Sequence, residues 1–316
     1  MDEFSYETMR RAERESFKCK ARDFVSSSNP LAYHRKLTKK IKEINKRVDE
    51  IAEDMEKFQL ETSLNSTIVA DGESSWQRSR QTASVLIDSE IVGRKDDKNT
   101  IIDILTKATT SSSNVHYHSL EKVPVISVVG MGGLGKTTLA QLVYNDESVV
   151  QHFDQRMWVC VSSDFDVEKI LIKMMESITL AKFDRLSNFD ALANKVRENL
   201  QGKKLLLVLD DLWNEDVDQW EMLKIPLIVG AQGSKILITT RNMQVADIVK
   251  GSFSPYQLEK LQEDECWSIM EKRAFSPGGA VKTPTMTNIG KEIAKNCSGL
   301  PLAAKFLGSL MHSKNK

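Results

Sequence analysis

The sequence predicts an α/β fold in which a mostly parallel five-stranded sheet carries helices on both faces, preceded by a helical coiled-coil segment and followed by a helical subdomain. From residue 91 onward, short apolar runs alternate with amphipathic helical patterns, as expected for strands that are buried on both faces. Before them, apolar residues recur with the heptad spacing of a coiled coil. The 316 residues are enough for roughly two or three domains with cores of their own.

The first predicted unit is a partial helical coiled-coil domain over residues 1–62. Pro30 follows a Ser/Asn stretch and marks a helix start. The apolar seam after it has a period of about 3.5 residues, which requires a partner helix at a shallow crossing angle. Basic side chains crowd the first half of this helix, and we interpret them as a solvated face rather than a site for an anionic partner. The seam residues are Leu37, Ile41, Ile44, Val48, Ile51, Met55 and Phe58.

Two polar stretches are expected to connect structured parts. Residues 63–90 are rich in Ser, Thr, Asn and Gly and form the predicted linker. Residues 108–122 contain His116 and His118, but the loop lacks a cluster of further Cys or carboxylate ligands. A surface loop is therefore favoured there over a metal site.

The predicted nucleotide-binding domain covers residues 91–255. Its amphipathic helices follow capping residues such as Asp166, and their apolar residues recur at intervals of three and four. Strands joined by such helices form a parallel sheet. The candidate strands are residues 125–129, 157–161, 205–209 and 235–239, with a short fifth near 256–258.

The first strand runs into the glycine-rich loop GMGGLGKTT and then into a helix. Glycines let backbone N–H groups turn inward around an anion, and the helix adds the positive end of its dipole. This pattern is typical of a P-loop NTPase core, in which the lysine reaches the β- and γ-phosphates and the next hydroxyl holds Mg²⁺. The predicted ligand-binding residues are Gly130, Gly132, Gly133, Leu134, Gly135, Lys136, Thr137 and Thr138, with Thr137 also on the metal.

Two acidic residues follow the buried run LLLVL. A carboxylate at that depth requires a cation or a hydrogen-bond network. In a P-loop fold Asp210 would order Mg²⁺, partly through water, and Asp211 would lie near the water that attacks the γ-phosphate. We therefore predict Asp210 as a metal residue and Asp211 as a catalytic one.

Arg241 ends the strand KILITT on the edge where ligands bind in open parallel sheets. Its guanidinium is predicted to contact the γ-phosphate, in a catalytic as well as a binding role. A surface arginine at a strand end is the alternative.

Residues 256–316 form the last predicted unit, an incomplete helical subdomain. Helical apolar stripes are followed by a turn in which Gly299 ends one helix and Pro301 begins the next. A plain helix–turn–helix would explain this spacing.

Composition excludes several function classes. The 44 basic and 44 acidic side chains cancel, so no field favours nucleic acid or membrane. Four dispersed cysteines indicate a reducing compartment, and neither a signal core nor a transmembrane run is found in the sequence. The expected location is cytoplasmic.

These motifs resemble the NB-ARC module of plant disease-resistance receptors, the coiled-coil class of intracellular immune proteins with leucine-rich repeats. The resemblance spans residues from about 91 to the end of the chain. It rests on six blocks in order: GMGGLGKTTLA, FDQRMWVCVS, LLLVLDDLW, GSKILITTR, YQLEKLQEDECW and CSGLPLA.

The resemblance implies an ADP/ATP switch of innate immunity, in which ADP holds a closed state and ATP permits self-association. It places the backbone of Val92, Gly93 and Arg94 along the adenine and packs Pro301 on the base. It makes Arg241 the nucleotide sensor. The implied partners are adenine nucleotide with Mg²⁺, further copies or related receptors, and a pathogen effector or guarded host protein.

Some family features are missing from the sequence. The Met-His-Asp block, the winged-helix portion and the leucine-rich repeats are not found, so we expect a fragment or short form. Asp211 stands where related ATPases place a glutamate, which predicts slow hydrolysis at most. The alternatives are a turnover ATPase and a nucleotide-indifferent adaptor or decoy that pairs through its coiled coil.

Overall fold

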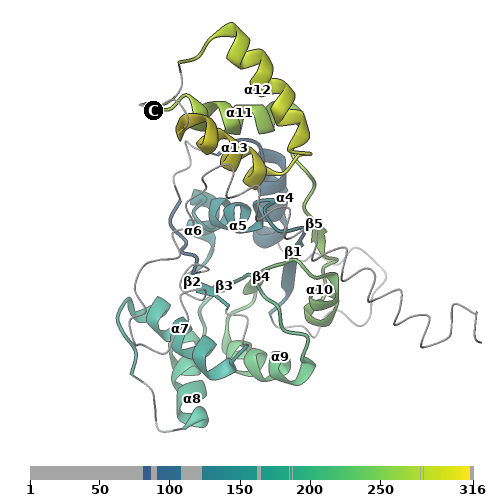
Figure 1. Ribbon diagram of the computed structural model, residues 1–316. Coiled ribbons are helices and arrows are strands. Elements are labelled where there is room, and N and C mark those ends of the chain that lie inside the picture. Colours follow the sequence, from purple (N-terminus) through teal and green to yellow (C-terminus); the bar gives the residue numbers. More distant parts are fainter. Residues whose placement is uncertain are drawn as a thin grey trace, which may run out of the picture. The chain divides into compact units, whose positions relative to one another are not determined.

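The computed structural model describes residues 81–86, 91–107, 123–161, 165–184, 186, 188–277, 279 and 281–313 (Figure 1). The chain divides into two compact units, Met1–Gly72 and Glu73–Lys316, and every described residue belongs to the second. The predicted coiled-coil segment and the loop that carries His116 and His118 lie outside the described residues.

A single five-stranded sheet forms the centre of this unit. Its strands are β1 Val125–Val129, β2 Gln155–Cys160, β3 Leu205–Asp210, β4 Lys235–Thr240 and β5 Tyr256–Gln257. They lie in the order β2-β3-β4-β1-β5, and every pairing is parallel. The predicted α/β class is therefore confirmed, and the carboxyl ends of β1, β3 and β4 meet at one edge of the sheet.

β1 has the predicted bounds, and β2 differs most from them. β3 and β4 each extend one residue beyond the prediction, to Asp210 and Thr240, and β5 ends at Gln257 instead of Leu258. β2 begins at Gln155, before the expected start at Met157, and ends at Cys160 instead of Val161. Gln155 and Arg156 are polar and do not belong to an apolar run, but both pair with β3 in register. β2 is an edge strand whose burial alternates, and its exposed positions accept polar side chains.

The helices cover both faces of the sheet (Figure 1). α4 Lys95–Thr106, α5 Lys136–Tyr144 and α6 Glu147–His152 share one core with the side chains of Leu206 and Val208. The opposite core contains Leu205, Leu207 and Leu209. Its helices are α7 Val167–Thr179, α8 Phe189–Leu200, α9 Val217–Lys224, η3 Ile225–Val229 and α10 Met243–Val249.

The starts of these helices differ in a way that matters for the site. Asp166, Asn188, Asp216 and Asn242 each accept a backbone N–H bond at the start of their own helices. Such caps stabilise a helix by about 1 kcal/mol. α5 instead begins after Gly135, whose φ is 92° and which offers no side-chain cap. The first N–H groups of α5 are therefore open to a ligand.

A helical subdomain follows β5. It consists of α11 Glu263–Ala274, α12 Pro284–Asn296 and α13 Pro301–Ser313, packed around Cys266, Trp267 and Met270. Gly299 has a φ of 75°, and Pro301 is the first residue of α13, as the sequence predicts. Within the described residues, no helix has the length and apolar character needed to cross a bilayer.

Candidate functional site

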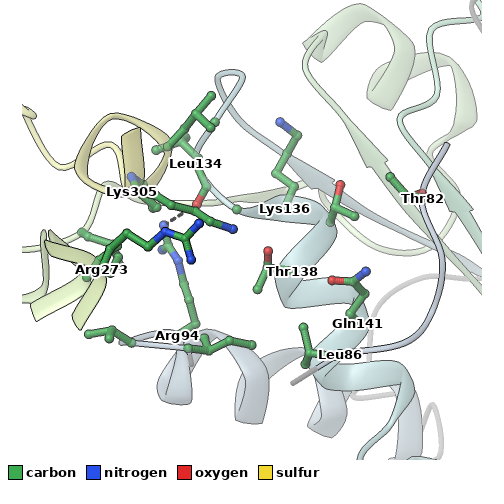
Figure 2. A pocket seen from close by; sticks show the side chains of 18 of the residues that line it. Thr82, Leu86, Arg94, Leu134, Lys136, Thr138, Gln141, Arg273 and Lys305 are labelled. Carbon is green, nitrogen blue, oxygen red and sulfur yellow. Dashed lines mark hydrogen bonds between the residues drawn. The ribbon is translucent and has the colours of Figure 1, made fainter. Parts of the chain in front are cut away.

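A cavity of about 780 Å³ lies at the carboxyl edge of the sheet, next to the glycine loop (Figure 2). Residues from the sheet edge, from α5, from the stretches 81–86 and 91–94 and from the helical subdomain line it. The structure brings together there the following predicted residues: Val92, Arg94, Gly133, Leu134, Gly135, Lys136, Thr137, Thr138, Asp211, Arg241 and Pro301. Gly93, Gly130, Gly132 and Asp210 lie beside it without lining it.

Lys136 is folded back into the loop that precedes it. Its side chain is only 7% exposed, and Nζ donates to the carbonyl oxygens of Gly130, at 2.7 Å, and Met131, at 3.1 Å. Burial, followed by the Arg241 guanidinium, lowers the pKa of Lys136. An anion in the loop would offset both effects, because a phosphate stabilises the charged ammonium.

Asp210 is fully buried at the end of β3 and is satisfied by three hydroxyl groups. Oδ1 accepts from Thr137, at 3.0 Å, and from Thr239, while Oδ2 accepts from Thr82, at 2.8 Å. Burial raises the pKa of Asp210 and the neighbouring Asp211 charge adds to this effect, whereas the three hydroxyl bonds oppose it. Sequence reasoning missed Thr82 and Thr239 as partners of this acid. For Thr239, the signal in the sequence was a hydroxyl at the end of the adjacent strand.

The Thr137 hydroxyl and the Asp210 carboxylate form a hard-oxygen donor pair, which fits Mg²⁺. In the described part of the chain, no cluster of three or more His, Cys, Asp or Glu side chains could hold a metal ion. Mg²⁺ does not require such a cluster, since it is commonly bound by one or two protein ligands together with phosphates and waters. The residues present therefore fit a metal that arrives with a nucleotide.

Asp211 and Arg241 lie together at the mouth of the cavity. Arg241 Nε is 3.5 Å from Asp211 Oδ1, and the guanidinium lies 5.2 Å from the centre of the Trp213 ring. Asp211 has a φ of 58°, and its N–H donates to Thr239 Oγ1. A Cβ on Gly132 would lie 2.9 Å from Arg241 Nη1, so this glycine gives the arginine room beside the loop.

Arg94 has a role that the sequence did not reveal. Its side chain donates to the carbonyl oxygens of Leu134, at 2.9 Å, and Glu259, at 2.7 Å, and pairs with Asp97 at 3.1 Å. It therefore joins the glycine loop to the segment after β5. The neighbouring Gly93 packs against Glu265, since a Cβ there would collide with that carboxylate.

The helical subdomain closes the cavity from the other side. The N–H of Leu302 donates to the Gly133 carbonyl at 3.2 Å, and a Cβ on Gly133 would lie 2.9 Å from Leu302 Cβ. Pro301 lines the cavity next to this contact. Figure 2 shows Arg273 and Lys305 on the same side, and neither was predicted, because helical periodicity does not tell which face meets a neighbouring domain.

Comparisons with known proteins agree with this geometry. The family model described as NB-ARC domain matches residues 98–278. A putative disease resistance protein, RGA1 of Solanum bulbocastanum, is 36% identical over 310 residues, covering 96% of this chain and 30% of the relative. A putative disease resistance RPP13-like protein 1 of Arabidopsis thaliana is 38% identical over 237 residues, covering 74% of this chain and 22% of the relative. The chain thus spans less than a third of the length of these relatives.

A solved structure supports the fold independently. Cdc6p from Pyrobaculum aerophilum matches with a TM-score of 0.50 and 17% identity, over 71% of this chain and 65% of that one. At that identity the match concerns the fold alone. The family model covers more than half of the chain, and its relatives are named disease resistance proteins. The chain therefore belongs to the NB-ARC family.

Proposed function

We propose that this chain binds ADP or ATP, with Mg²⁺, in the cavity at the carboxyl edge of the sheet and acts as a nucleotide-gated switch in plant innate immunity. The observation that carries the proposal is the convergence of Lys136, Thr137 and Asp210 beside an uncapped helix start. Toward a polyphosphate, Lys136 supplies positive charge, Thr137 ligates the metal and Asp210 orients the metal. The adenine preference and the immune role come from the family.

The switch follows from the position of the cavity between the sheet edge and the helical subdomain. Gly133 belongs to the glycine loop, whereas Pro301 and Leu302 belong to α13. A ligand that contacts both sides favours one arrangement of the two, and exchange of ADP for ATP shifts the populations by its differential affinity. A tenfold preference corresponds to about 1.4 kcal/mol, the size of one charge-assisted contact. We propose Arg241 as the sensor of the bound nucleotide. The proposed nucleotide-binding domain covers residues 91–255, and the helical subdomain covers residues 256–316.

Slow hydrolysis is compatible with this role. Asp211 faces the cavity but is paired with Arg241, and it has a shorter side chain than the glutamate of related ATPases. A steady-state rate near or above about 1 s⁻¹ would favour a turnover ATPase instead. We further propose a cytoplasmic location, supported by the buried free thiols of Cys266 and Cys297.

The direct test is to identify, by mass spectrometry, the nucleotide that copurifies with the chain. ADP at near-stoichiometric level is expected for a resting switch. Light scattering after size exclusion, with ADP and then with Mg·ATP, tests the self-association that the switch requires. Association that is the same in both nucleotides would instead support an adaptor that pairs through the predicted coiled coil, and calorimetry without measurable binding of either nucleotide would refute the proposal.

A further inference from the structure

A short segment before the nucleotide-binding domain, Gln81–Leu86, lies in the cavity. Three side-chain contacts hold it there. Thr82 Oγ1 donates to Asp210 Oδ2 at 2.8 Å, Gln141 Nε2 donates to the Ala83 carbonyl at 2.5 Å, and Asn145 Nδ2 donates to the Ser84 carbonyl at 2.7 Å. Figure 2 shows Thr82 and Leu86 on this segment, with Leu86 near Gln141 of α5. The segment therefore bridges the buried acid and the helix of the glycine loop.

The attachment is polar: the bonds to Ala83 and Ser84 are exposed, and the bond from Thr82 to Asp210 is partly buried. None of the residues 81–86 is buried, and Val85 is 80% exposed. The core clusters of the described residues contain no side chain from this segment. Exposed hydrogen bonds contribute little net stability. The segment is thus held by contacts that a modest competing interaction can break.

Thr82 bonds to one oxygen of Asp210, and elements of the core bond to the other. Oδ1 accepts from Thr137 and Thr239, which belong to α5 and β4, whereas Oδ2 accepts from Thr82. Thr137 can continue to donate its proton to Oδ1 while its hydroxyl oxygen ligates a metal. A metal-ordering acid also accepts a bond from water on the metal. Oδ2 is the atom at which that water and the Thr82 hydroxyl compete.

We propose that Thr82 is a gate on the magnesium position: when magnesium nucleotide binds, Asp210 exchanges the Thr82 hydroxyl for metal-bound water and residues 81–86 leave α5. This inference rests on the proposed nucleotide binding and adds a regulatory contact to it. Residues 81–86 join the predicted coiled-coil segment, 1–62, to the nucleotide-binding domain. Their release therefore couples the metal state of the site to the chain that leads to the predicted coiled-coil segment.

The first measurement compares Thr82→Val with Thr82→Ser in the full chain. Valine keeps the branched shape and removes the hydroxyl, whereas serine keeps the hydroxyl. Calorimetry with ATP in excess Mg²⁺ should show binding to Thr82→Val about tenfold tighter than to the wild type, since bonds to charged groups are strong enough for such a change. ATP in EDTA should bind equally to all three, and Thr82→Ser should behave as the wild type.

The second measurement follows the segment directly. In protein labelled at alanine methyl groups, the Ala83 resonance, assigned with Ala83→Gly, should sharpen when Mg·ATP is added to the wild type. It should already be sharp in Thr82→Val without nucleotide. Equal or weaker Mg·ATP binding by Thr82→Val, or an Ala83 signal that does not respond to Mg·ATP, overturns the gate and leaves nucleotide binding standing. A wild-type chain that binds no ATP in either buffer overturns the proposed function as well.

Discussion

The two ends of the same sheet both gather lysines, but their surroundings are opposite. At the carboxyl edge, Lys136 begins a helix, beside a glycine loop and a buried acid. At the amino edge, a smaller hollow of about 370 Å³ is lined by Lys107, His152, Lys204 and Lys235. Lys107 is the C-cap of α4 and His152 is the last residue of α6, so helix carboxyl ends lie there. Basic side chains at helix carboxyl ends offset the helix dipole, whereas a helix start attracts an anion.

A positive cluster alone therefore does not define a phosphate site. Lys235 is 2% exposed, with Nζ 5.1 Å from the centre of the Phe253 ring, a cation–π arrangement that packs the start of β4. Lys136 is similarly buried, but its ammonium rests on loop carbonyls that a phosphate can replace. Only the second arrangement provides both a charge and backbone N–H groups for a ligand.

The largest effect on nucleotide binding is expected from Lys136, and Lys204, at the other end of the sheet, serves as its control. Lys136→Ala should weaken ADP and Mg·ATP binding by about a hundredfold or more, because it removes a charge-assisted contact made inside a buried loop. Lys204→Ala, at the amino edge, should leave both affinities unchanged. Calorimetry on the two variants provides the test, and unchanged binding by Lys136→Ala would refute the assignment of the glycine loop.

Asp210→Asn should separate metal from nucleotide. The amide keeps the shape of the side chain and lets the surrounding hydroxyls reorient, but it loses the charge that orders Mg²⁺. We expect Mg²⁺ to improve ATP affinity about tenfold less than in the wild type, with ATP binding in EDTA nearly unchanged. Titrations with and without Mg²⁺ measure this difference. If Mg²⁺ improves ATP binding equally in both proteins, Asp210 has no part in holding the metal.

Two glycines with positive φ extend the contrast between the two edges. Gly135 starts α5 at the carboxyl edge, with a φ of 92°, and Gly202 precedes β3 at the amino edge, with a φ of 70°. A Cβ would meet only Thr138, at 4.0 Å, in the first case and nothing within 4 Å in the second. Alanine at either position should lower the free energy of unfolding by about 1–2 kcal/mol, through backbone strain. Only Gly135→Ala should also weaken nucleotide binding. Urea unfolding and calorimetry together check this, and equal affinity losses would contradict it.

The smallest effect is expected at Tyr256, in the edge strand β5. Burial, and then the hydrogen bond to Asp97, raise the pKa of Tyr256 to about 12. The fold favours neutral tyrosine, so this contribution to stability is complete below pH 10, the ordinary pKa, and is lost as the pH rises toward 12. Tyr256→Phe should remove one late step from the ultraviolet titration of the tyrosines and cost about 1 kcal/mol or less near neutral pH. Loss of a step near pH 10 instead would show that Tyr256 ionises as an exposed tyrosine does.

Local patterns sufficed for the parts of the site that are contiguous in the chain. The loop at 130–138 was predicted because such glycine spacing is uncommon where no anion binds. The acid after LLLVL is a weak signal by itself and was predicted because it follows that loop in the chain. The partners of these groups were not predicted. Thr82 is 128 residues from Asp210, and Arg94 is 40 residues from Leu134, so no periodicity connects them. The prediction for Arg94 concerned its backbone, whereas its side chain clamps the loop.

The α/β class, the glycine loop and the acid that follows LLLVL could be predicted from the order of the amino acids alone, because apolar periodicity and backbone freedom are properties of a few consecutive residues. The folded chain was needed to show which hydroxyls satisfy Asp210, why Gly133 faces Leu302, and that residues 81–86 reach the site. Those contacts depend on which strand ends and helix starts come together once the sheet order is set. Hydrogen bonds join atoms about 3 Å apart in space, and partners that are distant in the sequence leave no local sequence pattern. Only the three-dimensional arrangement therefore reveals them.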